Sequence, residues 1–421
     1  MIRFTFSLLI AGMLIFFSGC VKDSVKRTYT LLQPVYKEKA VVLNEVGSQP
    51  AQTLKNPGKI YVYGNYLFVN EINKGVHIID NTNPANPVNR RFINIPGNVD
   101  IAVKGNTLYA DLYTDMLAID ISDPTNVNVA EVVANVFPER QYGNGFIPEP
   151  GKFIVDWIEK DTTVDFNGDG GWRSCINCGI WLDAMSFSSA EPQAYAAAIS
   201  KITTGIGGSM ARFSVVEDYM YAVNISSLIV FDISTQQHPE RVNQVPMGWN
   251  IETIYPFQGN LFIGSSTGMF IYNISNPVAP SYVSAVSHIT MCDPVISDGK
   301  YAYVTLRAGA QCGNITGSQL QVLDIANLSA PVLINTYNLE NPFGLGKTGD
   351  LLWICDGTDG LKVFDAKDPK ALFFKYHIKT LEPYDVIPVN NNLIVSAKEG
   401  IVQFDASNPD RLTELSRIKK Q

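Results

Sequence analysis

The chain has 421 residues, of which 46% are hydrophobic, 11% aromatic and 17% charged. This much apolar surface is enough for a sizeable core, which excludes an intrinsically disordered chain. The 32 Lys and Arg residues against 40 Asp and Glu residues give a formal net charge of −8 at pH 7. This excess of acid argues against a protein dedicated to nucleic-acid binding, because phosphate groups need positive surface.

The first twenty residues have the pattern of a signal peptide. A single cation, Arg3, precedes the apolar run Phe4–Phe17, which is too short and wrongly flanked for a transmembrane helix. The run ends in the tetrapeptide FSGC, which resembles a bacterial lipobox except that Phe17 replaces the usual Leu. The resemblance implies that residues 1–19 are removed and that Cys20 is acylated. The alternative is an ordinary secretory signal with an incidental Cys.

Residues 20–56 are then expected to form a lipidated tether and N-terminal segment. Val21 follows Cys20, and a residue other than Asp at this position resembles outer-membrane sorting. Lys22 and Asp23 resemble the charged export signal of surface lipoproteins in Bacteroidetes-type bacteria. We therefore expect a palmitate-bearing lipoprotein of the bacterial outer membrane, exposed at the cell surface, that contacts the membrane only through its lipid anchor.

A short apolar run that ends in Asp or Asn recurs along the rest of the chain. Each run is rich in β-branched and aromatic residues and is usually followed by a Pro-containing turn, which predicts a β-strand stopped by that turn. Three further apolar stretches accompany each run, in units of about forty residues, and this pattern is typical of a four-stranded propeller blade. The runs end at Asp80, Asp120, Asp232, Asn273, Asp324, Asp365 and Asp405.

The recurring strand resembles the LVIVD repeat, a propeller-forming repeat of secreted and surface proteins. The segment Leu228–Asp232, with the sequence LIVFD, is its nearest match. The resemblance extends from Pro57 to about Ile418 and implies an all-β fold with a β-propeller at residues 57–418. It implies little about activity, because the repeat is defined by a structural strand.

The number of blades depends on one long interval between repeats. The strands ending at Asp120 and Asp232 are separated by almost three times the usual spacing, which predicts an insertion around residues 159–205. Without the inserted residues, about 320 remain, and at about forty residues each they predict eight four-stranded blades, the third of them degenerate. Seven blades plus an insertion is the alternative.

The cysteines fit an oxidising compartment. Cys175 and Cys178 are candidates for a tight disulfide, and Cys292 and Cys312 for a disulfide across one repeat. Cys355 lies in an apolar run and is expected to be a buried free thiol. The four His residues are scattered and no second Cys pair has ligand spacing, so we expect no zinc site and no required cofactor.

One segment follows the first half of a calcium-binding loop. Asp165, Asn167 and Asp169 alternate and are followed by Gly, as in D-x-[DN]-x-[DN]-G. The twelfth position, where an EF-hand has Glu, is Ile, so an EF-hand is excluded. A non-helical Ca²⁺ loop completed by Asp161 or Asp183 and a plain polar hairpin turn are the two remaining interpretations.

Acidic and aromatic residues gather near the expected starts of the innermost strands. In a propeller these strands surround the central channel, so side chains from different blades would meet at one mouth and suit a cation or a sugar. The partner of the whole protein is expected to be a protein or a carbohydrate. The alternative is that the acids only cap strand starts that face water. The candidate residues are Asp100, Trp249, Glu252, Asp293, Phe343, Tyr384 and Asp385.

These observations favour a lipid-anchored envelope propeller that serves as a binding or protein-interaction scaffold, with no catalytic residue and no nucleic-acid partner. The alternative is a hydrolase or lyase that acts on an envelope polysaccharide through the channel-mouth carboxylates. The segment Gly264–Gly268 matches the G-x-S-x-G pattern of serine hydrolases. It is expected at a hairpin tip rather than at a strand-to-helix turn, which excludes a nucleophile elbow.

Overall fold

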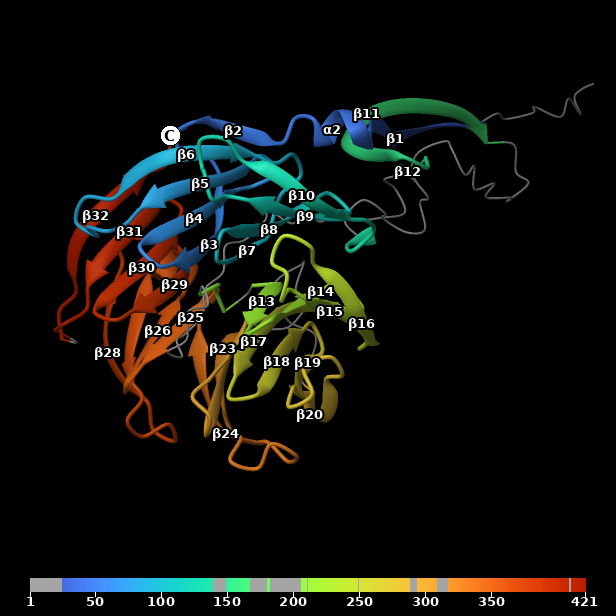
Figure 1. Ribbon diagram of the computed structural model, residues 1–421. Coiled ribbons are helices and arrows are strands. Elements are labelled where there is room, and N and C mark those ends of the chain that lie inside the picture. The colour runs from blue at the N-terminus through green and yellow to red at the C-terminus, as the bar shows by residue number, and fades with distance from the viewer. Residues whose placement is uncertain are drawn as a thin grey trace, which may run out of the picture. The chain divides into compact units, whose positions relative to one another are not determined.

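The computed structural model divides into two compact units, shown in Figure 1. One unit contains residues 1–36 and 154–187, and the other contains residues 37–153 and 188–421. Among the described residues the secondary structure is almost entirely β, with a short helix, α2 (Lys39–Leu43), and a 3₁₀ turn, η4 (Gly357–Asp359). The structure describes residues 25–138, 149–166, 180–181, 206–209, 211–248, 250–287, 294–308, 317–408 and 410–421.

The smaller unit is a three-stranded antiparallel sheet. Its strands are β1 (Val25–Glu38), β11 (Lys152–Phe166) and β12 (Ile180–Trp181), with β1 in the centre. Exposed polar side chains cross-link β1 and β11, since the Thr30 hydroxyl donates to Asp161 Oδ1 at 2.8 Å. The N-terminal segment therefore pairs with the segment that we predicted as an insertion.

The larger unit contains seven sheets of four antiparallel strands in chain order. In the first sheet, β6 also pairs with β2 (Gly47–Pro50) as a fifth strand. The blade strands are β3 (Pro57–Tyr63), β4 (Tyr66–Glu71), β5 (Gly75–Asp80), β6 (Val88–Asn94); β7 (Ile101–Lys104), β8 (Thr107–Leu112), β9 (Asp115–Asp120), β10 (Asn128–Val133); β13 (Phe213–Val216), β14 (Tyr219–Val223), β15 (Ser227–Asp232), β16 (Glu240–Pro246); β17 (Ile251–Phe257), β18 (Asn260–Ser265), β19 (Gly268–Asn273), β20 (Ser281–Ser287); β21 (Val295–Ser297), β22 (Tyr301–Leu306), β23 (Ser318–Asp324), β24 (Val332–Leu339); β25 (Leu345–Thr348), β26 (Leu351–Cys355), β27 (Leu361–Asp365), β28 (Phe373–Ile378); and β29 (Pro383–Val389), β30 (Asn392–Ala397), β31 (Gly400–Asp405), β32 (Thr413–Lys419).

The seven sheets are the blades of a closed propeller. The innermost strands β3, β7, β13, β17, β21, β25 and β29 contact one another in this order, and β30 of the last blade contacts β3 of the first. Figure 1 shows the first blade, in blue, beside the last blade, in red. The ring closes through polar contacts, because the Asn81 and Gln403 side chains bond each other at 2.7 and 3.0 Å, and the Gln421 amide donates to Leu54 O at 2.9 Å.

The prediction of an all-β propeller is confirmed, and the described residues form eight antiparallel sheets. Seven of these sheets are blades, and the eighth is the three-stranded sheet of the smaller unit. The strand order thus supports seven blades plus an insertion, our alternative, in place of eight four-stranded blades. The reason lies in β11 (Lys152–Phe166), which pairs with β1 and not with the strands of the third blade.

The predicted turn chemistry is present in every blade. The Asp or Asn that ends the third strand accepts, through Oδ1, a hydrogen bond from the backbone amide two residues later, with distances from 2.8 Å for Asp232 to 3.0 Å for Asp80. This bond replaces the next ladder bond, so the strand stops and the chain turns toward the fourth strand. The same bond occurs at Asp80, Asp120, Asp232, Asn273, Asp324, Asp365 and Asp405.

Buried tyrosines tie neighbouring blades together. The Tyr109 hydroxyl of β8 donates to Gln236 O in the third blade at 2.7 Å, and the Tyr221 hydroxyl of β14 donates to Pro277 O in the fourth blade at 3.0 Å. Each bond reaches the turn that precedes the fourth strand of the next blade, so the turn also fixes the spacing between blades. In the part of the chain that the structure describes, no helix has the length and apolar character needed to cross a membrane.

Candidate functional site

Two of the predicted channel acids are fully buried at the start of innermost strands. Asp100 directly precedes β7 and is 0% exposed, and Asp385 lies in β29 and is 1% exposed. Glu252, in β17, is partly exposed. Trp249 and Asp293 lie outside the described residues.

Asp100 is held in an ion pair that the sequence did not indicate. The ammonium of Lys59, in β3, contacts Asp100 Oδ2, and the two side chains are 4% and 1% exposed. The same oxygen accepts the backbone amide of Arg212 at 3.0 Å, and Asp100 Oδ1 accepts the amide of Ile101 at 3.0 Å. Asp100 therefore joins the first three blades at one end of the channel.

Asp385 has a different environment. Its Oδ1 accepts the backbone amide of Val386 at 2.8 Å, whereas Oδ2 has no hydrogen-bond partner among the residues that the structure describes. The carboxyl lies against the sixth blade, where a Cβ at Gly344 would overlap Oδ1. Burial raises the pKa of Asp385 well above its usual range, and the positive charge of Lys59 only partly opposes this rise. Asp385 therefore keeps its proton to a higher pH than an exposed carboxyl does.

The proton that Asp385 keeps gives the fold a testable pH dependence. The folded state keeps this proton where the unfolded chain loses it, so the free energy of unfolding should fall as pH rises above about 4, by at most about 1.4 kcal/mol per pH unit. Asp385→Asn should remove this fall, because an amide has the same shape and no charge. Urea unfolding of both chains between pH 4 and 8 measures the effect, and parallel pH profiles would contradict it.

Two of the three predicted aromatic residues, Phe343 and Tyr384, meet at the same end of the channel. The rings of Phe343 and Tyr384 lie 5.3 Å apart between centroids in an edge-on arrangement at 74°. The Arg307 guanidinium stacks over the Phe343 ring at 4.3 Å, a contact that the sequence analysis missed. The Tyr384 carbonyl accepts the amide of Gly344 at 2.9 Å, which holds the sixth and seventh blades together beside Asp385.

A segment that precedes the third blade runs through the channel, and we call Ile206–Ser209 with Ala211 the channel segment. Ile206 exchanges two backbone hydrogen bonds with Val62, of 2.8 and 2.7 Å, on the edge of β3 that faces away from β4. The Ser209 hydroxyl accepts the amide of Leu345 in the sixth blade at 3.2 Å. Ala211 O accepts the amide of Ile254 in the fourth blade at 2.9 Å. Contacts to the innermost strands of three separate blades place this segment inside the ring.

The remaining sequence predictions have mixed outcomes. Cys355 is a buried free thiol, as expected, and burial raises its pKa well above the usual range. Gly264–Gly268 joins β18 to β19 as a hairpin, so the rejection of a nucleophile elbow is confirmed. Asp165 lies in β11, but its side chain is not described. The acylation site, the other calcium ligands and the disulfide candidates lie outside the described residues and stay predictions: Cys20, Asn167, Asp169, Cys175, Cys178, Cys292 and Cys312.

The ring and the segment within it define the class of the protein, a seven-bladed β-propeller whose central channel is occupied by its own chain. Four LVIVD repeats are present in the chain, at residues 57–90, 97–134, 207–245 and 292–339. They coincide with the first, second, third and fifth blades and confirm the resemblance that the strand pattern indicated.

Comparison with one solved structure, at a TM-score of 0.50, also supports the propeller fold. The periplasmic gluconolactonase of Pseudomonas aeruginosa matches with a TM-score of 0.50 and 12% identity, over 86% of this chain and 96% of that chain. BamB from Moraxella catarrhalis matches with a TM-score of 0.49 and 8% identity, over 89% and 99% of the two chains. At these identities the likeness concerns the fold alone. No curated protein sequence matches the chain significantly.

Proposed function

We propose that this propeller is a lipid-anchored protein of the bacterial outer membrane, exposed at the cell surface, that binds a protein or carbohydrate partner as a rigid scaffold. The lipobox-like tetrapeptide ending at Cys20 supports the anchor. In this proposal the blade loops are the contact surfaces, because the channel segment lies within the ring and bonds to the innermost strands. Loops on a fixed frame are the usual binding surfaces of such folds.

A polysaccharide hydrolase or lyase is the second candidate. It is favoured by two carboxyl groups in different environments at one end of the channel, as an acid–base pair requires: Asp100 is paired with Lys59, and burial raises the pKa of Asp385. Their burial weighs against it, since at 0% and 1% exposure neither carboxyl is open to a polymer. Both carboxylate oxygens of Asp100 also accept hydrogen bonds from backbone amides of the fold.

Crosslinking on intact cells tests the binding role. Purification through an epitope tag is expected to recover the same envelope component with the wild-type chain and with Asp385→Asn, and a glycan-binding screen with the purified chain separates a carbohydrate from a protein partner. Failure of both experiments to yield a reproducible partner would contradict the scaffold. Release of reducing ends from purified envelope polysaccharide, lost in Asp385→Asn, would support the enzyme instead.

The anchor has its own test. Cys20→Ser should abolish incorporation of an alkyne-labelled palmitate and move the chain from the detergent phase to the aqueous phase in a Triton X-114 partition, because the acyl chains provide its only membrane affinity in this proposal. Val21→Ala, which leaves the acceptor thiol in place, should label like the wild type. Labelling of Cys20→Ser at the wild-type level would show that the lipid is attached elsewhere or that the assignment is wrong.

A further inference from the structure

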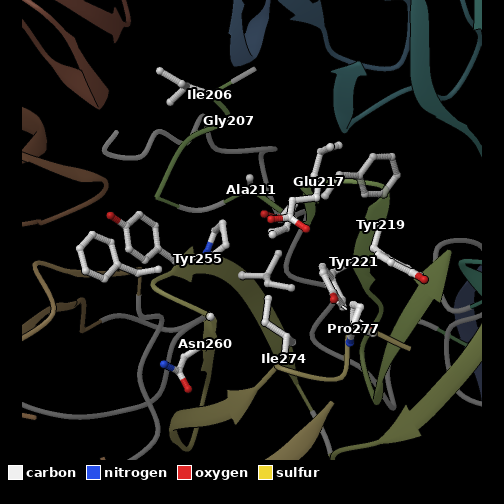
Figure 2. A pocket seen from close by; sticks show the side chains of 18 of the residues that line it. Ile206, Gly207, Ala211, Glu217, Tyr219, Tyr221, Tyr255, Asn260, Ile274 and Pro277 are labelled. Atoms are coloured by element: carbon white, nitrogen blue, oxygen red, sulfur yellow. Dashed lines mark hydrogen bonds between the residues drawn. The ribbon is translucent and has the colours of Figure 1, made fainter. Parts of the chain in front are cut away.

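A cavity of about 440 Å³ lies between the third and fourth blades. Its walls come from the hairpin ends of β13 and β14 and of β17 and β18, whereas Asp100 and Asp385 lie near the beginnings of innermost strands. Ile206 and Gly207 of the channel segment close one side, and Figure 2 shows their position above the hollow. The volume is in the range of roughly 300–1,000 Å³ that is usual for small-molecule sites.

Six of the described residues that line this cavity are aromatic. The Tyr221 hydroxyl donates to Pro277 O at 3.0 Å and the Tyr255 hydroxyl to Ser297 O at 3.3 Å, so both hydroxyls are already used within the fold. Both residues are also buried, at 0% and 1% exposure, so the rings open to a ligand are those of the partly exposed Tyr219 and Phe257. The Tyr255 and Phe257 rings are nearly parallel, at 9°. The aromatic lining residues are Tyr61, Phe213, Tyr219, Tyr221, Tyr255 and Phe257.

The cavity has one charged side chain, and it is acidic. Glu217 lines it from the turn between β13 and β14, and no Lys, Arg or His is among the described residues that line it. The Glu217 charge also contributes to the raised pKa of Tyr221, after the larger effects of burial and of Tyr219. Figure 2 shows Glu217, Tyr219 and Tyr221 on the same wall. This charge disfavours phosphates and carboxylates and favours a cation.

We propose that the cavity binds a small organic cation that has an ammonium group on an apolar body. The partly exposed rings of Tyr219 and Phe257 attract the cationic head through their quadrupoles, the exposed Glu217 supplies the opposite charge, and the apolar lining covers the rest of the ligand. The channel segment forms part of the site, because Ile206–Gly208 and Ala211 line the cavity. The inference rests on the proposed binding role and deepens it by naming a ligand class.

Calorimetric titration of the full chain tests this inference with paired probes. Choline and benzyltrimethylammonium should bind saturably, and choline should bind at least about tenfold more tightly than its neutral isostere 3,3-dimethylbutan-1-ol. Glu217→Gln should weaken choline binding about tenfold and leave binding of the neutral isostere unchanged. Tyr219→Leu should weaken the binding of both cations. Glu240→Gln, which removes an exposed acid at the start of β16 that does not line the cavity, is the matched control.

Several outcomes would overturn the inference. The inference is wrong if neither cation binds saturably, or if choline and its neutral isostere bind equally. It is also wrong if Glu217→Gln and Glu240→Gln have equal effects, or if glucose or acetate binds more tightly than choline. Failure here is separable from failure of the proposed function, because crosslinking on cells reads out the envelope partner without these probes. A chain that captures its partner but binds no cation would support the proposed scaffold function and contradict only the cation site.

Discussion

Replacing Lys59 with Met is expected to lower the free energy of unfolding by about 3–5 kcal/mol, as for other buried ion pairs that lose one partner. The Asp100 carboxylate would remain 1% exposed with its charge no longer matched. Two backbone amides, of Ile101 and Arg212, would still donate to it, which places the expected loss toward the lower end of this range. Urea unfolding at pH 7, followed by tryptophan fluorescence and circular dichroism, measures the change.

An exposed ion pair in the same unit provides the control for this result. Lys37 and Glu45 are also in contact, but their side chains are 38% and 40% exposed, so Lys37→Met should cost less than about 1 kcal/mol. Adding Asp100→Asn to Lys59→Met should recover part of the loss, because it removes the unmatched charge and keeps an acceptor for the two amides. Equal losses in Lys59→Met and Lys37→Met would show that the buried charge contributes little.

The blade repeat could be predicted because its signal is local. The third strand of each blade ends in an Asp or Asn whose side chain accepts a hydrogen bond from the amide two residues later. The strand, its last residue and the turn therefore lie within a few positions of one another. The LVIVD strand and its turn are thus a single local structure repeated along the chain. Such a structure is visible in the sequence before any tertiary contact is known.

The number of blades could not be predicted in the same way. Lys152–Phe166 has the composition of a strand, but composition does not indicate with which strand it pairs. It pairs with β1, which lies more than a hundred residues earlier in the chain. The channel segment is a similar case. Gly207 and Gly208 suggest a loop, and only the backbone bonds between Ile206 and Val62 reveal that this loop lies inside the ring.

The end of the channel was partly predictable. Asp100 and Asp385 share a repeat position, directly before Ile101 and Val386, and the structure does bring both into the channel environment of Lys59. Lys59 stands at the same position before Ile60, so an alignment by repeat would have found it. A pattern made of acids alone does not indicate Lys59, because Lys59 is a cation. Both acids lie at strand starts, as in the alternative that they only cap strands, and do not form an open binding mouth. They differ from that alternative in facing the interior and not water.

Gly400→Ala is expected to lower the free energy of unfolding by about 2–5 kcal/mol, the combined cost of a strained backbone and of overpacking. Gly400 begins β31 with φ = +121°, a region that favours glycine, and an added Cβ would overlap the carbonyl oxygen of Ile418 in β32. The end of β32 also closes the ring, because Gln421 donates to Leu54 O. Hydrogen exchange should therefore show lost protection in β32 and in the contact at Leu54, beyond the change in the unfolding midpoint.

The same glycine recurs at the start of the third strand in four blades, which makes the steric argument testable beyond one site. Gly75, Gly268 and Gly360 also have positive φ, and a Cβ at each would overlap a carbonyl oxygen of the fourth strand. Gly47→Ala is the control, since nothing lies within 4 Å of a Cβ there. If Gly400→Ala and Gly47→Ala unfold at the same urea concentration, the fourth strand can move aside at little cost. The close approach would then reflect loose packing at the ring closure rather than a requirement for glycine.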